Sequence, residues 1–394
     1  MRETRTMIHD VVGHEEARQS LARAIAAGTL PSALLLLGPR GIGKQRVALW
    51  TAQLVLCDAP TPAGPCDACR HCSRVRRLEH PDLHWHMPLP RPRGASTPEK
   101  LQDALEVARA EHLQELRDDP LRFSRESRRT AIYLAAARTI RRAAQSRPSE
   151  GREQIFIIGD AERLVPQESS PEAANALLKL LEEPPTDTRF ILTSSEPGRL
   201  LDTIRSRTVP LHLAPLDTHQ VQETLVRLAG ADPEAARHAA VLGEGSIGTA
   251  LGYLPDGDEA GPLEALRRRA ARLVQAALQN PGEGYRIALT DFGASDGQAL
   301  IDLLDHVDRW LRDLATAAAH ATVRAVSVDA HDWLDSTVEK HALHPVDLAR
   351  ALEHVETARV EARGNVSPQL VVAGLVSDLH ERLTRAPSPT GGAR

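Results

Sequence analysis

The four cysteines of this 394-residue chain have a spacing that suits metal chemistry. They are Cys57, Cys66, Cys69 and Cys72. The series ends in two consecutive C-x2-C steps, and four thiolates so spaced can surround one tetrahedral Zn²⁺. Because four cysteines leave no position open for a substrate, the sequence predicts a closed, structural zinc module over residues 57–72. His71 lies between two of these cysteines and is expected to face solvent.

A glycine-rich turn, GPRGIGKQ, is the second stretch whose residue types suit chemistry. It fits the pattern G-x4-G-K, in which backbone N–H groups and a helix N-terminus cradle phosphates while the lysine reaches the outer ones. The residues of this degenerate phosphate loop are Gly38, Gly41, Gly43 and Lys44. Gln45 follows them, where the full pattern has Ser or Thr to hold Mg²⁺. ATP binding therefore stays open, and ATP hydrolysis is not expected.

The segments around these residues alternate between strand-like and helical patterns. Apolar runs at Ala33–Leu37, Ile155–Leu164 and Phe190–Ser195 predict strands, and Gln45–Leu56 has helical periodicity. From Asp10 to about Pro210 this order predicts an α/β core with a mainly parallel sheet covered by helices. HPDLHWH, after the cysteines, is expected to return the chain to a strand.

Changes of composition along the chain predict its domain boundaries. The core is placed at residues 1–210, and its Pro/Arg-rich, highly charged part 88–130 is predicted to be an inserted surface segment, either a flexible loop or a solvated helix. The predicted parts that follow are a helical lid at 211–254, an all-α domain at 263–383 and a disordered tail at 384–394.

The overall composition narrows the class of protein. The formal net charge of -5 argues against a surface that is a nucleic-acid-binding cation throughout. No run approaches eighteen apolar residues, and the opening MRETRTMIHD lacks the apolar core of a signal peptide. The sequence therefore predicts a cytoplasmic protein that does not contact membranes.

Two further motifs accompany the apolar strands. AANALLKLLEEPP, residues 173–185, lies between the apolar runs Ile155–Leu164 and Phe190–Ser195. TIRSR, residues 203–207, follows the second of these two runs. Together these segments resemble the bacterial clamp-loader subunits of DNA polymerase III, which are AAA+ proteins. The resemblance covers about Asp10–Leu254 without the insertion, and beyond it rests mainly on GNVSPQL at residues 364–370. It implies an AAA+ core, a small helical lid and an all-α collar.

Several positions depart from the pattern of the family's motor subunits. In those subunits, the strand that corresponds to the apolar run from Ile155 ends in Asp-Glu. This chain has Gly159 and Asp160 there, or Asp160 and Ala161 if the register shifts by one. Gly248 stands where the lid motif places an arginine on the γ-phosphate. Because phosphoryl transfer depends on charges around the γ-phosphate and Mg²⁺, these departures and Gln45 predict no intrinsic ATPase activity.

The TIRSR segment matches the family's Ser-Arg-Cys motif, with Thr208 in place of the cysteine. The resemblance implies that Arg207 is an arginine finger acting in trans on a neighbouring subunit's nucleotide, with Ser206 shaping the turn. Arg199 and Arg205 are expected to be ordinary surface charges. The central helix presents Asn175, Lys179 and Glu182 at helical spacing, and Lys179 either contacts a DNA phosphate or serves helix packing and local electrostatics.

A zinc module, a damaged ATPase site and a retained finger together resemble the delta-prime type of subunit. This type implies a nucleoid-associated complex with tau/gamma motor subunits and a delta subunit, which loads a sliding clamp onto primed DNA. Two alternatives stay open: a tau/gamma-type motor ATPase of the same loader, and a zinc-dependent nucleic-acid-binding module.

Overall fold

The computed structural model describes residues 11–121, 123, 130–164, 172–291, 297–321, 326–364 and 366–384. Its contacts divide the chain into two compact units, one ending at Leu251 and the other beginning at Gly252. The tail predicted to be disordered lies, from residue 385 on, outside the described residues. No helix in the described ranges is long and apolar enough to cross a membrane.

A five-stranded sheet with the order β2-β5-β6-β1-β7 forms the centre of the first unit, and every pairing in it is parallel. The strands are β1 (Ala33–Leu37), β2 (Leu83–His86), β5 (Gln154–Ile158), β6 (Thr188–Ser194) and β7 (Val209–His212). A short antiparallel pair joins β3 (Leu89–Pro90) to β4 (Thr130–Ala131). The α/β fold class is confirmed, and the predicted strands are present, although the one predicted at Ile155–Leu164 already ends at Ile158.

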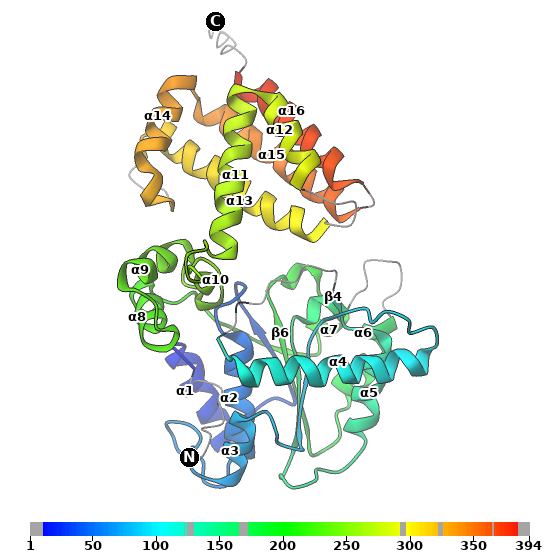
Figure 1. The fold of residues 1–394 in the computed structure, drawn as a ribbon. Coiled ribbons are helices and arrows are strands. Elements are labelled where there is room, and N and C mark those ends of the chain that lie inside the picture. Colours follow the sequence, from blue (N-terminus) through cyan, green and yellow to red (C-terminus); the bar gives the residue numbers. More distant parts are fainter. Residues whose placement is uncertain are drawn as a thin grey trace, which may run out of the picture. The chain divides into compact units, whose positions relative to one another are not determined.

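Helices surround this sheet (Figure 1). Those that precede β7 are α1 (Glu15–Ala26), α2 (Lys44–Leu56), α3 (Arg70–Arg76), α4 (Pro98–Asp118), α5 (Leu134–Ala144), α6 (Glu172–Glu182) and α7 (Asp202–Arg205), with the 3-10 turns η1 (Ala161–Leu164) and η2 (Pro197–Arg199). After β7 come α8 (Thr218–Ala229), α9 (Pro233–Leu242) and α10 (Ile247–Leu251).

Alternation along the strands divides the buried side chains between two cores. Leu34 and Leu36 of β1 pack in one core with α1, α2 and part of α4, whereas Leu35 and Leu37 pack in the other with α5, α6 and α7. This is the period of two that a strand imposes on its side chains. All five residues of β1 are buried, as expected for a parallel strand covered on both faces.

The predicted surface insertion contains α4, a helix of 21 residues that contacts α5. Thr97 caps it, because its Oγ1 accepts a hydrogen bond from the Lys100 N–H at 3.3 Å. Of the two forms predicted for this segment, the helix is present, but one of its faces is buried rather than solvated. Leu105 is buried in the first core, and Leu101, Ala108, Leu113 and Leu116 pack partly buried beside it, at the spacing of one helix face.

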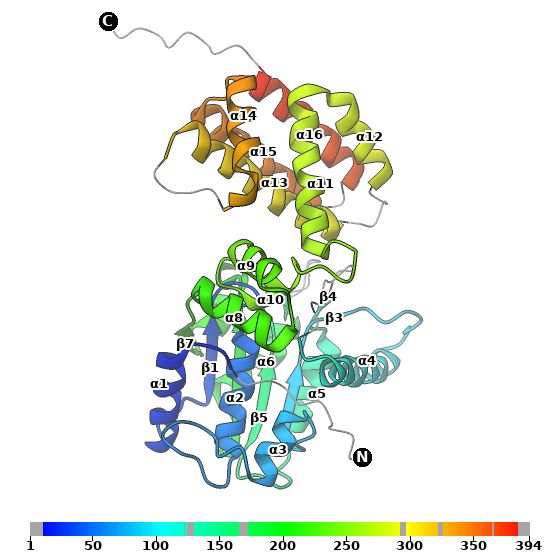
Figure 2. The same cartoon turned by 60° about the vertical axis from the view of Figure 1, so that its left-hand side comes forward.

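Helices α8, α9 and α10 form a small group within the first unit (Figure 2). This group contacts the loop after β1, where the Gly248 N–H donates to the Gly41 carbonyl at 3.0 Å. The Ser246 Oγ donates to the Arg40 carbonyl at 2.9 Å. A Cβ added at Gly248 would lie 2.9 Å from the Gly41 Cα, so the contact is backbone against backbone.

In the described part of the second unit the named elements are all helices, and an isolated bridge joins Asp256 to Glu259 before the first of them. Its elements are α11 (Pro262–Gln279), α12 (Pro281–Asp291), α13 (Gly297–Ala318), η3 (Val328–Ala330), α14 (His331–His341), α15 (Pro345–Arg363) and α16 (Pro368–Thr384). A buried guanidinium ties several of them together. Arg267 pairs with Glu264 at 2.8 Å and with Asp329 at 2.6 Å, and it lies 5.2 Å from the Trp310 ring centroid.

Asp82, immediately before β2, anchors the loop that leads into β5. Its buried carboxylate accepts hydrogen bonds from the backbone N–H groups of Ser149, Glu150 and Gly151. Burial opposes the charged form, but the three donors outweigh it and lower the pKa of Asp82 below its ordinary value.

We predict that Asp82→Asn lowers the free energy of unfolding at pH 7 by about 1–3 kcal/mol, since an amide cannot satisfy three N–H donors equally. A folded-state pKa below the unfolded one gives stability that is present above about pH 4 and lost as pH falls through the folded pKa. Urea unfolding at pH 7 and pH 3 measures this, and the variant should lose less stability between the two. Asp103→Asn, on the exposed side of α4, is the control, and equal behaviour of the two variants would contradict the prediction.

We also predict that Gly248→Ala destabilises the first unit by about 1–3 kcal/mol through overpacking against Gly41. Helix propensity alone predicts the opposite sign, since alanine is favoured over glycine in a helix. The control is Gly198→Ala, where an added Cβ meets nothing within 4 Å. Thermal unfolding of both variants measures the difference, and a Gly248→Ala protein as stable as the parent would disprove the close contact.

Candidate functional site

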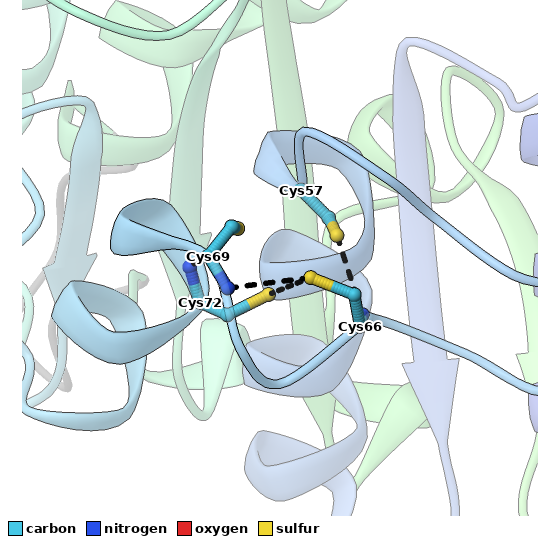
Figure 3. Close-up of side chains that lie close together, drawn as sticks. All are labelled: Cys57, Cys66, Cys69 and Cys72. Carbon is cyan, nitrogen blue, oxygen red and sulfur yellow. Dashed lines mark hydrogen bonds between the residues drawn. The ribbon is translucent and has the colours of Figure 1, made fainter.

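The four predicted metal ligands gather in one place (Figure 3). Cys57 follows the end of α2, Cys66 lies in the next loop, and Cys69 and Cys72 belong to the start of α3. Their sulfur atoms all lie within 4.8 Å of one another. The Cys66 and Cys72 sulfurs are 3.9 Å apart, close to the ~3.8 Å that Zn–S bonds of ~2.3 Å give in a tetrahedron. The donor set therefore fits one tetrahedral, thiophilic cation.

Backbone N–H groups point at these sulfurs. The N–H of Cys66 donates to the Cys57 Sγ, that of Cys69 to the Cys66 Sγ and that of Cys72 to the Cys69 Sγ, at 3.3, 3.4 and 3.4 Å. The N–H groups of Ala68 and Cys69 lower the pKa of Cys66 to about 6. Burial raises the pKa of Cys57 and Cys72, so a cation is needed to hold these two as thiolates.

The expectation that His71 faces solvent was wrong, because its side chain is buried. Its Nδ1 lies 2.7 Å from the Nε2 of the buried His80. The His80 Nδ1 accepts a hydrogen bond from the Asp82 N–H, and burial lowers the pKa of His80 to about 4. Neutral His80 must then carry its proton on Nε2 and donate it to His71. These contacts link the cysteine-bearing helix to the start of β2.

The predicted phosphate loop follows β1 and opens α2, as expected. Gly38, Gly41 and Gly43 have φ values of 152°, 75° and 105°, which favour glycine over other residues. The His14 Nε2 lies 2.7 Å from the Ile42 carbonyl oxygen and ties the start of α1 to this loop.

Lys44 is buried, and its ammonium group is bound within the chain. It donates to the carbonyls of Gly38 and Pro39 at 2.9 and 2.7 Å and to the Ser195 Oγ at 2.8 Å. These acceptors use all three of its N–H donors. Burial lowers the pKa of Lys44 to about 8, against the opposing charges of Asp160 and Glu162, so the group stays mostly protonated at neutral pH.

The Gln45 side chain lies against Gly159, one of the residues predicted from the sequence to correspond to the acidic pair of the motor subunits. A Cβ added at Gly159 would lie 2.9 Å from the Gln45 Nε2 and 3.2 Å from its Oε1. Gln45, which has no hydroxyl, and Gly159, which has no carboxylate, are therefore in contact. A side chain larger than glycine at residue 159 would require the Gln45 amide to move.

Asp160 has a φ of 45°, and its N–H donates to the Thr193 Oγ1 at 3.0 Å. Sequence reasoning missed two residues beside it. The Glu162 carboxylate is buried and accepts from the Ser195 N–H at 3.1 Å, while its Oε2 has no hydrogen-bond partner among the described residues. Ser195 could have been found, because it follows β6 and the ends of parallel neighbouring strands meet at one edge of a sheet.

Arg207 lies away from the phosphate loop's contacts and is partly exposed. Its guanidinium pairs with Glu182, the last residue of α6, and its Nη1 donates to the Thr203 carbonyl at 2.8 Å and to the Ser206 Oγ at 3.2 Å. Thr208 is buried, and its hydroxyl donates to the Ile204 carbonyl at 3.1 Å. The turn that carries Arg207 is thus fixed by its own chain.

The other basic residues named from the sequence lie on the surface. Arg199 pairs with Glu196 at 3.1 Å and Arg205 pairs with Asp202 at 3.2 Å, each within its own turn of chain. Lys179 is exposed on α6. The side chain of Asn175 lies outside the described part of that helix.

Comparisons with known proteins agree on one family. A family model described as "DNA polymerase III, delta subunit" matches residues 13–217. The chain is 31% identical to DNA polymerase III subunit delta' of Bacillus subtilis over 206 residues, which is 52% of this chain and 49% of that protein. It is 27% identical to subunit tau of Escherichia coli over 302 residues, which is 72% of this chain and 40% of that protein.

Subunit gamma/tau of Mycobacterium tuberculosis is 27% identical over 397 residues, which is 92% of this chain and 59% of that protein. In these alignments the chain spans about half the length of its relatives, between 40% and 59%. The family model itself covers more than half of the chain. The chain therefore belongs to the DNA polymerase III clamp-loader family.

Proposed function

We propose that this chain is a delta-prime-type clamp-loader subunit, which does not hydrolyse ATP itself and supplies Arg207 to the nucleotide of a neighbouring motor subunit. One observation carries the proposal. The positions that would catalyse hydrolysis within the chain are filled by its own groups, whereas a guanidinium suited to act on another subunit is partly exposed.

Three contacts support the loss of hydrolysis. Lys44 would have to exchange three hydrogen bonds to reach a phosphate. Gln45 fills the space beside Gly159, and Gly248 presses its backbone on Gly41 where an arginine side chain would be needed. A triphosphate with Mg²⁺ would therefore meet a loop whose lysine is engaged and whose metal position is occupied.

The partly exposed Arg207 supports the second half of the proposal. Arginine always carries its charge and presents a planar set of donors that matches phosphate oxygens. Thr203 and Ser206 hold its Nη1, so the side chain is ordered by contacts with its own turn. The proposed partners are tau/gamma motor subunits and a delta subunit, and through them a sliding clamp and primed DNA in the cytoplasm.

We further propose that the four cysteines hold one structural Zn²⁺. The ion would supply the positive charge that the buried thiolates of Cys57 and Cys72 need. The loop between α2 and α3 has few large apolar side chains of its own, so the metal would replace a core there. Through His71 and His80 the module is joined to β2.

A motor ATPase of the same loader is the second candidate. It is favoured by the tau relatives, whose alignments cover 72% and 92% of the chain against 52% for the Bacillus subtilis delta' subunit. ATP hydrolysis by the purified chain without other subunits would select this candidate. A stand-alone nucleic-acid-binding module is not favoured, because the family match extends far beyond the cysteines.

For the metal, we predict one zinc ion per chain in protein purified without chelators. Cys69→Ser removes one of four ligands, so this variant should lose most of its zinc and become protease-sensitive between α2 and α3. Its far-ultraviolet circular dichroism should stay near that of the parent, because the sheet has its own cores. Metal analysis by mass spectrometry makes the test. Parent protein without zinc, or a variant that keeps all of it, would refute the site.

For the finger, we predict that Arg207→Ala assembles normally but lowers the DNA- and clamp-stimulated ATPase of the reconstituted complex. Loss of an arginine finger lowers the hydrolysis rate at a single site by ~10³–10⁵-fold. The ATPase rate of the whole complex should fall only roughly two- to tenfold, because its other nucleotide sites keep their own arginine fingers. Arg207→Lys should rescue poorly, since an ammonium lacks the planar set of donors.

The matched control for the finger is Arg205→Ala, an exposed arginine two residues away that pairs with Asp202 in its own turn. It should leave the ATPase rate unchanged. Normal clamp loading by the Arg207→Ala complex would contradict the proposal that Arg207 acts as an arginine finger.

A further inference from the structure

Arg207 is held by acceptors from two different elements. Its Nη1 donates to Thr203 and Ser206, which belong to α7 and its end, so these contacts are local. Its Nε donates to the Glu182 Oε1, and its Nη2 pairs with the same oxygen. Glu182 ends α6, 25 residues earlier in the chain, so this carboxylate connects the arginine to a different helix.

The pair is placed where it contributes little to folding. The side chains of Arg207 and Glu182 are 30% and 42% exposed, and ion pairs at such exposed sites stabilise a fold only slightly. The effect of the Arg207–Glu182 pair on the conformation of the arginine side chain is larger. A free arginine side chain samples many rotamers, whereas contacts at Nε, Nη1 and Nη2 select one.

The geometry still leaves a donor for a ligand. A guanidinium has five N–H donors, and the four contacts to Glu182, Thr203 and Ser206 leave one of them, on Nη2, for an acceptor from outside the chain. The carboxylate therefore orients the group without using all of its donors.

We propose that Glu182 is a positioning residue for Arg207: it fixes the guanidinium in the orientation in which it meets a neighbouring subunit's nucleotide. The inference rests on the finger function proposed above. An arginine already held in one orientation has less conformational freedom to lose when the transition state forms. Glu182 thereby acts on the reaction rate through Arg207 and touches no substrate itself.

The test uses the reconstituted complex with Glu182→Gln, Arg207→Ala and the double variant. Glutamine keeps the length of the side chain but removes the charge that holds two guanidinium nitrogens. Glu182→Gln should lower kcat for ATP about threefold to tenfold with KM nearly unchanged, as expected for a group misplaced at the reacting centre. In the Arg207→Ala background, the same change should have no further effect.

Glu183→Gln is the matched control, because Glu183 is the next residue and is exposed. It should leave kcat unchanged. In the isolated chain, the ¹⁵N-edited signal of the Arg207 Hε should exchange with water slowly in the parent and rapidly in Glu182→Gln, while both proteins unfold at the same temperature.

The outcomes separate the two proposals. If Arg207→Ala does not lower the ATPase rate, the finger itself is wrong. If it does, but Glu182→Gln equals Glu183→Gln, raises kcat, or lowers kcat further in the Arg207→Ala background, then Glu182 does not position the arginine and only this inference fails.

Discussion

The hydrogen bonds of the buried Lys44 ammonium organise the edge of the sheet where three strands end. This one group joins the carbonyls of Gly38 and Pro39 after β1 to the hydroxyl of Ser195 after β6. The carboxylates of Asp160 and Glu162 after β5 favour its charge. A buried cation needs such acceptors, because an unsolvated ammonium without them would be expelled or neutralised. The loop, the strand ends and the acidic turn are therefore stabilised as one unit.

The rest of the first unit fits around that edge. Parallel strands with alternating side chains create two cores, and helices on both faces bury them. The small helical group contacts the predicted phosphate loop through the Gly248–Gly41 backbone contact and through the Ser246 hydroxyl. At the far end of α2 the cysteine cluster begins, so one helix has the phosphate loop at its start and the first candidate metal ligand after its end.

Much of this arrangement could be predicted from the sequence. Apolar runs bounded by Gly, Pro and charged residues placed the starts of β1, β5 and β6 to within two residues, since a strand buried on both faces admits few polar side chains. The cysteine spacing predicted the cluster, because thiol chemistry restricts which residues can serve. The inward orientation of His71 could not be predicted, because its partner His80 becomes a neighbour only after α3 folds back on β2. The buried face of α4 was hidden by its high charge, which occupies the opposite side of the helix. Glu162 and Ser195 come together only through strand pairing, which local periodicity does not reveal.

The contact between Gln45 and Gly159 has a consequence for how this site could change. An aspartate introduced at Gly159 would meet the Gln45 amide, whose side chain would have to move. An arginine introduced at Gly248 would collide with the backbone of Gly41 before it could approach a phosphate. Because Gln45 contacts Gly159 and Gly248 contacts Gly41, the effects of substitutions within each pair are not expected to be additive. A change at Gly159 or Gly248 therefore requires its neighbour, Gln45 or Gly41, to move or change as well.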